Sequence, residues 1–326
     1  MISVNREAKK IVDHMVDNSD KLNIDVLEIE NGTTILDCGI KAKGGMQAGK
    51  LLSEICMGGL GEVSFTQMSI CECDGDDDGC CSRNFHAMNV VVDQPLIGCM
   101  ASQYAGWSIS IGKFFALGSG PARALALREK LFEDLKYKDE SDVAILVLET
   151  SKMPEAEVAD YIAEKCGVKS EDLYILVAPC ASVAGSIQIS ARLVETGMHK
   201  MHEIGFDIGS VVSGFGVCPI APIAKNDLEA MGRTNDCILY GGRTWYNVDC
   251  EDDEIGKMIE KVPSDSSKDY GMPFLEIFEK YNRDFYKIDP LLFSPADITI
   301  NNMRTGNNFH AGNVNIDVLR KSLGVD

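Results

Sequence analysis

The segment at residues 143–177 reads VAILVLETSKMPEAEVADYIAEKCGVKSEDLYILV. Its first six residues are an unbroken apolar run, which predicts a buried strand over 143–148. Residues 154–166 repeat apolar side chains at helical spacing and stop at Gly167, a residue type that commonly ends helices. Residues 173–177 are again apolar and predict a second strand. The order strand, helix, strand is typical of a protein that mixes helices with sheets.

On the N-terminal side of this segment, helices and hairpins follow one another. Apolar residues between positions 4 and 16 recur at steps of three and four, which predicts the first helix. Asn31 and Gly32 separate two apolar stretches, and this dipeptide is a strong signal for a tight hairpin turn. The other elements predicted before residue 143 are a short helix over 47–57, strands over 63–70, 86–92 and 96–101, and a helix over 121–135.

On the C-terminal side, the main prediction is a long helix over 183–204 that ends at Gly205. The remaining predicted elements are strands over 208–212, 237–240, 244–248 and 297–301 and helices over 225–231, 251–261, 273–285 and from 315 onward. The expected fold class is therefore mixed α/β (α+β), with largely antiparallel or mixed sheets flanked by helices. A length of 326 residues fits two domains, which we place at 1–138 and 139–326, with the C-terminal segment free to pack back on the first.

Composition excludes several classes of protein. The 50 acidic residues outnumber the 31 Lys and Arg, for a net charge of −19. Nucleic-acid binding is disfavoured, because it needs a surplus of positive charge on some face. No apolar run approaches the ~18 residues of a membrane span, and charges stand where a secretory signal would be apolar. We therefore expect a cytoplasmic protein that binds neither nucleic acid nor membrane.

The twelve cysteines are expected to be reduced, buried thiols, since no secretory signal is present. One group lies close together in the sequence: Cys71, Cys73, Cys80 and Cys81. Its spacing departs from the paired C-x-x-C knuckles of structural zinc sites. The acidic stretch at 74–79 begins like a calcium-binding loop, but Phe85 stands where the bidentate glutamate is due. No metal site is predicted here.

The long helix carries a polar stripe beside its apolar face, formed by Gln188, Arg192, Glu195, His199 and His202. One interpretation is a solvated or interface stripe, stabilised by an ion pair between Arg192 and Glu195 three residues apart. A second is a metal site of Glu195, His199 and His202, although their order matches no zinc-binding helix motif. A third is a catalytic pair, in which Arg192 orients Glu195 as a general base and keeps it ionised.

A second candidate site lies at residues 101–123. Tyr104 and Trp107 stand among small residues there, and a Gly-Ser-Gly-Pro turn opens a helix that carries Arg123 in its first turn. The N–H groups of this helix start, together with Lys113 and Arg123, are suited to hold a phosphate or carboxylate. A glycine turn followed by a basic helix explains the pattern equally well. The chain contains no Walker loop, G-x-S-x-G elbow or Cys-His signature.

Six short motifs share one resemblance. They are NREA at 5–8, SQYAGW at 102–107, GSGPAR at 118–123, PCASVAGS at 179–186, ARLVE at 191–195 and NNFHAG at 307–312. With these motifs the whole chain resembles the methenyltetrahydromethanopterin cyclohydrolase family, pterin-dependent one-carbon enzymes of methanogenic archaea and some methylotrophs. The acidic segment between Cys73 and Cys80 is not a feature of that resemblance.

The resemblance implies a homotrimer of two-domain subunits that binds the pterin in a cleft between the domains, with no metal ion or redox cofactor. The implied reaction is the reversible addition of water to a cationic methenyl bridge, which gives the formyl derivative and a proton. Glu195 would be the general base and Arg192 would position the water.

The residues that the resemblance implies for substrate binding are Ser102, Gln103, Tyr104, Trp107, Lys113 and Arg123, the last two at a phosphate-bearing tail. Two other functions stay open. One is a metal-dependent hydrolase built on Glu195, His199 and His202, and the other is a protein that binds the pterin without converting it.

Overall fold

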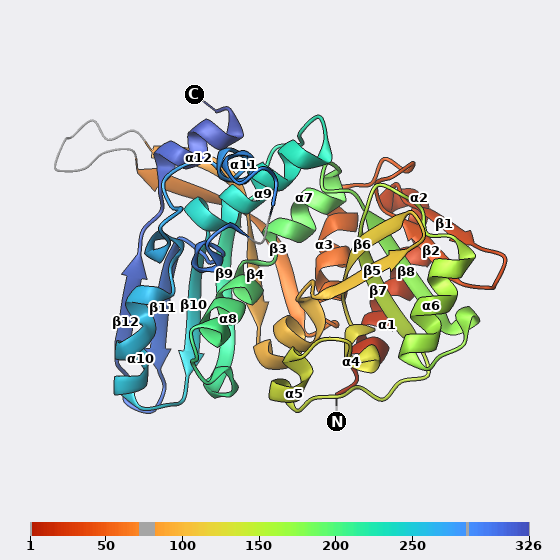
Figure 1. Ribbon diagram of the computed structural model, residues 1–326, viewed down its shortest axis with the longest axis horizontal. Coiled ribbons are helices and arrows are strands. Elements are labelled where there is room, and N and C mark those ends of the chain that lie inside the picture. The colour runs from red at the N-terminus through yellow and green to blue at the C-terminus, as the bar shows by residue number, and fades with distance from the viewer. Residues whose placement is uncertain (1, 72–81, 285–286, 326) are drawn as a thin grey trace.

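The structure is a computed structural model that describes residues 2–71, 82–284 and 287–325. Its strands form two six-stranded sheets, each mixing parallel and antiparallel pairs, with helices packed against them (Figure 1). The predicted mixed α/β class is confirmed. Within the described ranges, no helix combines the length and the apolar character that crossing a bilayer requires.

The first sheet has the strand order β1-β2-β8-β7-β6-β5. Its strands are β1 (Asp25–Glu28), β2 (Thr34–Asp37), β8 (Leu173–Ala178), β7 (Ala144–Glu149), β6 (Phe114–Ser119) and β5 (Trp107–Ile111). The central strands β2, β8 and β7 run parallel, and the outer pairs are antiparallel. The Asn31–Gly32 hairpin is confirmed as the connection of β1 and β2.

Strand β7 is covered on both faces. The helices that cover it are α1 (Val4–Asp17), α3 (Met46–Cys56) and α6 (Ala156–Cys166). Ile145 and Val147 pack with α1 and α3, whereas Leu146 and Leu148 pack with α6. A strand buried on both faces needs an apolar side chain at every position, which explains the unbroken apolar run.

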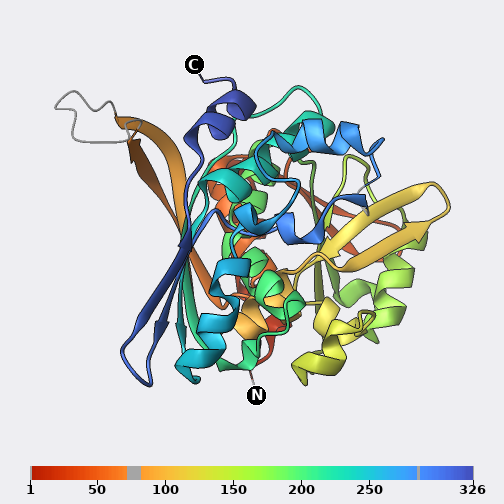
Figure 2. The same ribbon diagram turned by 60° about the vertical axis from the view of Figure 1, so that its left-hand side comes forward.

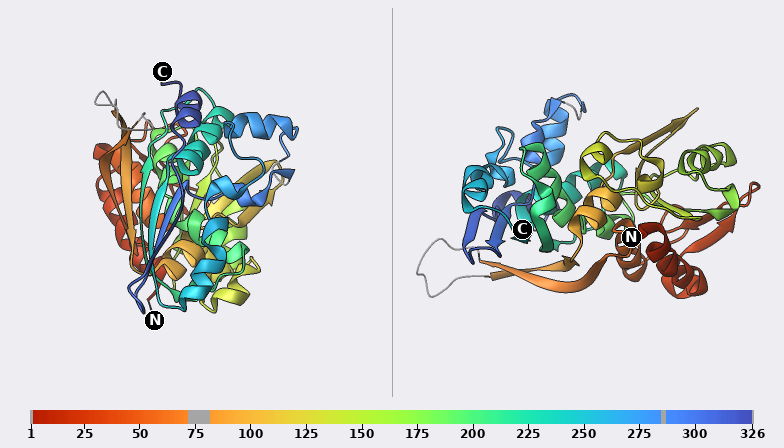
Figure 3. Two further views of the ribbon diagram at one scale, coloured as in Figure 1. Left: turned by 90° about the vertical axis from the view of Figure 1, so that its left-hand side faces the viewer. Right: turned by 90° about the horizontal axis from the view of Figure 1, so that it is seen from below.

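The second sheet has the strand order β12-β11-β10-β9-β4-β3. Its strands are β12 (Asn308–Gly312), β11 (Asp297–Asn302), β10 (Arg243–Val248), β9 (Val211–Pro219), β4 (Ser82–Val92) and β3 (Gly61–Cys71). The long strands β3 and β4 run along one side of the molecule, and β3 contacts α3 (Figure 3). Each sheet thus combines strands from both sides of residue 138. The division into domains at that residue stays a prediction.

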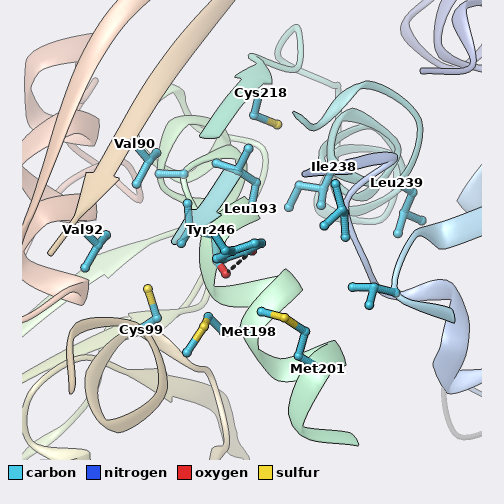
Figure 4. Close-up of a cluster of buried hydrophobic side chains, with 14 of the residues drawn as sticks. Val90, Val92, Cys99, Leu193, Met198, Met201, Cys218, Ile238, Leu239 and Tyr246 are labelled. Carbon is cyan, nitrogen blue, oxygen red and sulfur yellow. Dashed lines mark hydrogen bonds between the residues drawn. The ribbon is translucent and has the colours of Figure 1, made fainter. Parts of the chain in front are cut away.

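Helices cover one face of the second sheet (Figure 2). The helices α8 (Leu193–Glu203) and α9 (Asp227–Gly241) pack on β9, and α8 also packs on β10. Figure 4 shows Met198 and Met201 of α8 among the buried side chains of this core, beside Tyr246 of β10. The Tyr246 hydroxyl donates to the carbonyl oxygen of Val194 at 2.9 Å, so the sheet fixes the position of α8.

The long helix predicted over 183–204 is wrong as a single element. It is two helices, α7 (Val183–Ser190) and α8, with Ala191 and Arg192 between them. The carbonyl oxygen of Ala191 accepts a hydrogen bond from the Gln103 side chain, from a segment far away in the sequence. Helical periodicity continues across the junction, which is why the sequence pattern did not reveal the break.

Three more predicted elements need correction. Residues 96–101 were expected to form a strand and instead belong to a π-helix, Leu96–Gln103, because a short apolar run looks alike in a buried helix and a strand. For the same reason residues 237–240 complete α9 and are not a strand. The helix expected over 121–135 is two short helices, α4 (Arg123–Ala126) and α5 (Leu131–Leu135), since Leu127 adopts a left-handed φ of 49°.

The cysteines whose side chains are described are all free and buried, as expected of reduced thiols. Cys73, Cys80 and Cys81, with the acidic segment among them, lie outside the described residues, and so does the side chain of Cys71. The zinc and calcium interpretations of that segment are therefore untested.

Candidate functional site

Arg192 and Glu195 lie where α7 turns into α8. The Nη1 atom of Arg192 is 3.5 Å from Oε2 of Glu195, and the two side chains are only 10% and 6% exposed. A buried ion pair is screened by salt far less than a surface pair. The sequence therefore placed the two residues correctly next to each other, and the structure adds that both are buried.

Gln103 holds this junction in place. Its Nε2 atom donates to the carbonyl oxygen of Ala191 at 3.1 Å, and Arg192 Nη1 donates to the backbone carbonyl oxygen of Gln103 at 2.6 Å. The same carbonyl accepts from Ser119 Oγ at 2.6 Å. The end of the π-helix and the start of α8 are thus tied together, which restricts the guanidinium to one direction.

The Glu195 carboxyl is poised between its two protonation states. Burial raises its pKa to about 7, although the positive charges of Arg192 and Arg123 act in the opposite direction. A group with a pKa near the working pH accepts and returns a proton with small free-energy changes. A carboxyl with a pKa in this range is suited to proton transfer.

The pair lines a cavity of about 480 Å³, a volume typical of small-molecule sites. Its apolar wall is formed by Leu117, Ile189, Met231, Ile238, Leu239, Ile288, Pro290 and Phe293. The charged side chains that line it are Glu149, Arg192, Glu195, Lys200 and Glu203. Such a cavity suits a largely apolar ligand with a few polar or charged groups.

Tyr104 lines the same cavity and is held in a stack. Its ring lies against the His199 imidazole with a centroid distance of 4.7 Å and an interplanar angle of 16°, while the Arg123 guanidinium lies 5.2 Å from its centroid. Burial, reinforced by the charge of Glu195, raises the pKa of Tyr104 to about 12. The phenol therefore stays protonated and can donate a hydrogen bond to a ligand.

The predicted substrate-binding residues differ in whether they line the cavity. Tyr104 lines the cavity, whereas Ser102 and Gln103 are fully buried, with Ser102 Oγ donating to the carbonyl of Cys56 at 2.6 Å. Trp107 is 2% exposed and packs in the core of the first sheet. Lys113 lies exposed at the turn between β5 and β6. Neither Trp107 nor Lys113 lines the cavity.

Arg123 is fully buried, and its guanidinium lies over the Tyr104 ring. Its guanidinium pairs with Glu129 and donates to the carbonyl oxygens of Met100 and Ser102 at 3.1 and 2.9 Å. Through these two hydrogen bonds Arg123 fixes the end of the π-helix. Contact of Lys113 or Arg123 with a phosphate stays a prediction.

Two cavity residues were missed by sequence reasoning. Lys200 is 1% exposed, its Nζ donates to the Leu291 carbonyl and to Ser266 Oγ, and burial lowers its pKa to about 8. Glu149 ends strand β7. A polar residue directly after a buried parallel strand is a usable signal, since ligands often bind at the carboxyl ends of such strands.

The histidines of the stripe have other partners. His199 stacks on Tyr104, and His202 Nε2 lies 3.3 Å from a carboxylate oxygen of Asp134. Across residues 2–71, 82–284 and 287–325, no three His, Cys, Asp or Glu side chains are grouped so that they could hold a metal ion. The structure thus does not assemble the metal site considered from Glu195, His199 and His202.

Comparisons with known proteins place the chain among close relatives. A family model described as Cyclohydrolase (MCH) matches residues 3–323. The chain is 48% identical over 327 residues to the methenyltetrahydromethanopterin cyclohydrolase of Methanocaldococcus jannaschii, covering 99% of both chains. It is 48% identical over 330 residues to that of Methanothermobacter thermautotrophicus, covering all of both chains. The identity to that of Methanococcoides burtonii is 45%, covering 100% and 99%.

Proposed function

The chain belongs to the methenyltetrahydromethanopterin cyclohydrolase family, and on that basis we propose that it interconverts methenyl-tetrahydromethanopterin plus water and formyl-tetrahydromethanopterin plus a proton. It is thus a hydrolase that acts on a carbon–nitrogen bond of a cyclic amidine. The observation that carries the residue assignment is the buried Arg192–Glu195 pair, which lines a ligand-sized cavity and has a carboxyl pKa near 7.

The proposed reaction begins with water, because the cationic bridge carbon is already electrophilic. The water oxygen forms a bond to the bridge carbon while Glu195 takes one proton, which leaves a neutral carbinol. Glu195 then returns this proton to the arylamine nitrogen as the carbon–nitrogen bond breaks. The second proton, from the carbinol hydroxyl, is released to solvent, so the products are the formyl compound and one proton. A single positioned group thus serves as base and as acid.

Arg192 is proposed to orient the water and the carboxylate. Its Nη1 already bonds to the Gln103 carbonyl and faces Glu195, so the guanidinium is fixed before any ligand arrives. Holding reactants in one geometry removes part of the entropic barrier of the reaction. Tyr104 is proposed to contact the pterin, since its ring lines the cavity and is fixed by Arg123 and His199.

One experiment separates this function from its rivals. The methenyl chromophore is followed spectrophotometrically after addition of chelator-treated protein. Loss of absorbance at catalytic protein concentration supports the cyclohydrolase. Activity that disappears with the chelator and returns with zinc or iron would identify a metal-dependent hydrolase instead. Tight binding of the chromophore with no change in its amount would identify a binding protein.

We also propose that the enzyme is a cytoplasmic homotrimer that needs neither metal nor redox cofactor. The apolar side chains of Val91, Phe215 and Trp245 are 42%, 41% and 45% exposed and form one row across the second sheet. An apolar row of this kind favours contact with another subunit. Sedimentation of a fully active monomer at micromolar concentration would exclude the trimer.

A further inference from the structure

We propose that Glu149 is the counter-ion of the substrate's cationic methenyl bridge, and that it makes the cavity selective for the cationic methenyl form over the neutral formyl form. This inference rests on the proposed function and adds a specificity residue to it. Glu149 is the last residue of β7 and lines the same cavity as Arg192 and Glu195.

The Glu149 carboxylate is held by neutral groups alone. Cys180 Sγ donates to its Oε1 at 2.6 Å, and Gln188 Nε2 lies 3.5 Å from its Oε2. Both donors are uncharged, so they orient the carboxylate without neutralising it. Among the residues that the structure describes, Glu149 takes part in no ion pair within 4.0 Å. Its negative charge therefore remains available to a ligand.

The other carboxylates of the cavity already have cationic or titratable neighbours. Glu195 faces Arg192, and Glu203 lies 3.7 Å from His199 and 3.9 Å from His202. Glu203 is also 54% exposed, which weakens any charge interaction through solvent. Glu149 is partly buried, and it is thus the lining carboxylate in the described part of the chain that has neither a cationic side chain nor a histidine within 4.0 Å.

Glu149, Arg192 and Glu195 line one cavity. Burial raises the pKa of the Cys56 thiol, and the charges of Arg192, Glu149 and Glu195 all act on it. Cys56 Sγ also donates to Oε1 of Gln188 at 3.8 Å, whose amide group reaches Glu149. The two carboxylates therefore belong to the wall of the same cavity.

The carboxylates of Glu195 and Glu149 have different roles in this proposal. Glu195 must exchange a proton during the reaction, so it cannot remain a constant negative charge. Glu149 is not needed for proton transfer and can stay opposite the substrate cation throughout. The bridge loses its positive charge when water adds, so Glu149 attracts the methenyl form and has little net charge to attract in the formyl form. Its contribution is thus charge selectivity.

The test compares Glu149→Gln with the matched control Glu157→Gln, which removes an exposed carboxylate of α6 that does not line the cavity. KM for the methenyl compound is measured in the hydration direction, and KM for the formyl compound in the cyclisation direction. Glu149→Gln should raise the methenyl KM on the order of tenfold or more, the size expected for losing a close charge interaction. The formyl KM should change by less than about threefold.

The equilibrium constant of the reaction does not depend on the enzyme. If Glu149→Gln raises the methenyl KM and leaves the formyl KM unchanged, the ratio of kcat for hydration to kcat for cyclisation must therefore rise by the same factor as the methenyl KM. Glu157→Gln should leave both KM values and this ratio nearly unchanged. Should Glu149→Gln fail to fold, Glu149→Asp and Glu149→Asn offer the same comparison of a charged and a neutral side chain. The aspartate variant should then keep the selectivity for the cation that the asparagine variant loses.

Equal changes of both KM values, or no change of either, would refute the role of Glu149 while wild-type activity leaves the proposed function intact. Failure of the wild-type protein to convert or bind the methenyl compound would refute the proposed function itself. The two failures are therefore distinguishable.

Discussion

The Arg192 guanidinium donates to the backbone carbonyl of Gln103 at 2.6 Å, while the Gln103 side chain donates to the carbonyl of Ala191, the residue before Arg192. This reciprocal contact joins two segments that are 89 residues apart. It lies at the break between α7 and α8, where Arg192 and Glu195 line the cavity. The backbone break and the hydrogen bond that fixes the direction of Arg192 therefore occur at the same contact.

Replacement of Glu195 tests the general base directly. Glu195→Gln keeps the shape of the side chain but cannot accept a proton from water, so turnover should fall by roughly 10²–10⁴-fold. Binding of the methenyl compound should survive, since the cavity wall is intact. Steady-state hydration rates and a binding titration measure both quantities. Near-full turnover in a folded variant would show that the pair is structural.

Replacement of Arg192 tests the positioning role. Arg192→Lys keeps the positive charge but loses the planar guanidinium that faces both Gln103 and Glu195, so turnover should be severely impaired. The double variant with Glu195→Gln should be little worse than the poorer single variant, because both residues act on one water and one proton. Rates of the three variants decide this. Multiplicative losses would indicate independent roles.

The pKa of Glu195 predicts the pH dependence of the hydration reaction. The carboxyl must be ionised to take a proton, and burial raises its pKa in the folded protein to about 7. The hydration kcat/KM should therefore fall about tenfold for each pH unit well below 7 and level off above it. A pH profile measures this directly. A profile that stays flat down to pH 5 would contradict Glu195 as the base.

The sequence pattern was sufficient to predict three elements at the centre of the first sheet. Strand β7, helix α6 and strand β8 were predicted because each is long, strongly apolar on its buried side and bounded by clear end signals. The break between α7 and α8 was not predictable in this way. At the break the Ala191 carbonyl accepts a hydrogen bond from the Gln103 side chain, which comes from a segment distant in sequence and is not visible in local periodicity.

The sequence predicted the part of the candidate site that depends on local geometry. Arg192 directly precedes α8 and Glu195 lies in its first turn, so their proximity follows from local geometry alone. Glu149 and Lys200 join them only through the packing of β7 and of the segment around Leu291 against the cavity. The resemblance implied Trp107 and Lys113 as ligand contacts; neither lines this cavity, and their contact with a ligand stays a prediction.

The stripe histidines should be dispensable for chemistry. The variant His199→Ala with His202→Ala removes the ring stacked on Tyr104, an interaction worth roughly 0.5–1.5 kcal/mol, so activity should fall by no more than about tenfold. His199→Phe, which keeps an aromatic ring against Tyr104, is the control and should recover most of the loss. A bound metal equivalent in wild-type protein that vanishes in the double variant would overturn this prediction.

Asp236 should limit stability at neutral and alkaline pH. It lies on α9, is fully buried, and contacts the Phe274 N–H at 2.8 Å and the Ser322 hydroxyl. Burial raises its pKa from the usual 3.8 to about 7. Between these two values the folded chain keeps a proton that the unfolded chain has lost, so the free energy of unfolding falls as pH rises through this window.

Asp236→Asn keeps both contacts, since its amide oxygen accepts from Phe274 and its amide nitrogen donates to Ser322, but it carries no charge. The variant should therefore be more stable than wild type at pH 8, by on the order of 1–4 kcal/mol, and nearly equal to it at pH 4. Urea unfolding at the two pH values measures the difference. An advantage of the same size at both would attribute the effect to packing, and no advantage at pH 8 would show that the Asp236 carboxylate is compensated when ionised.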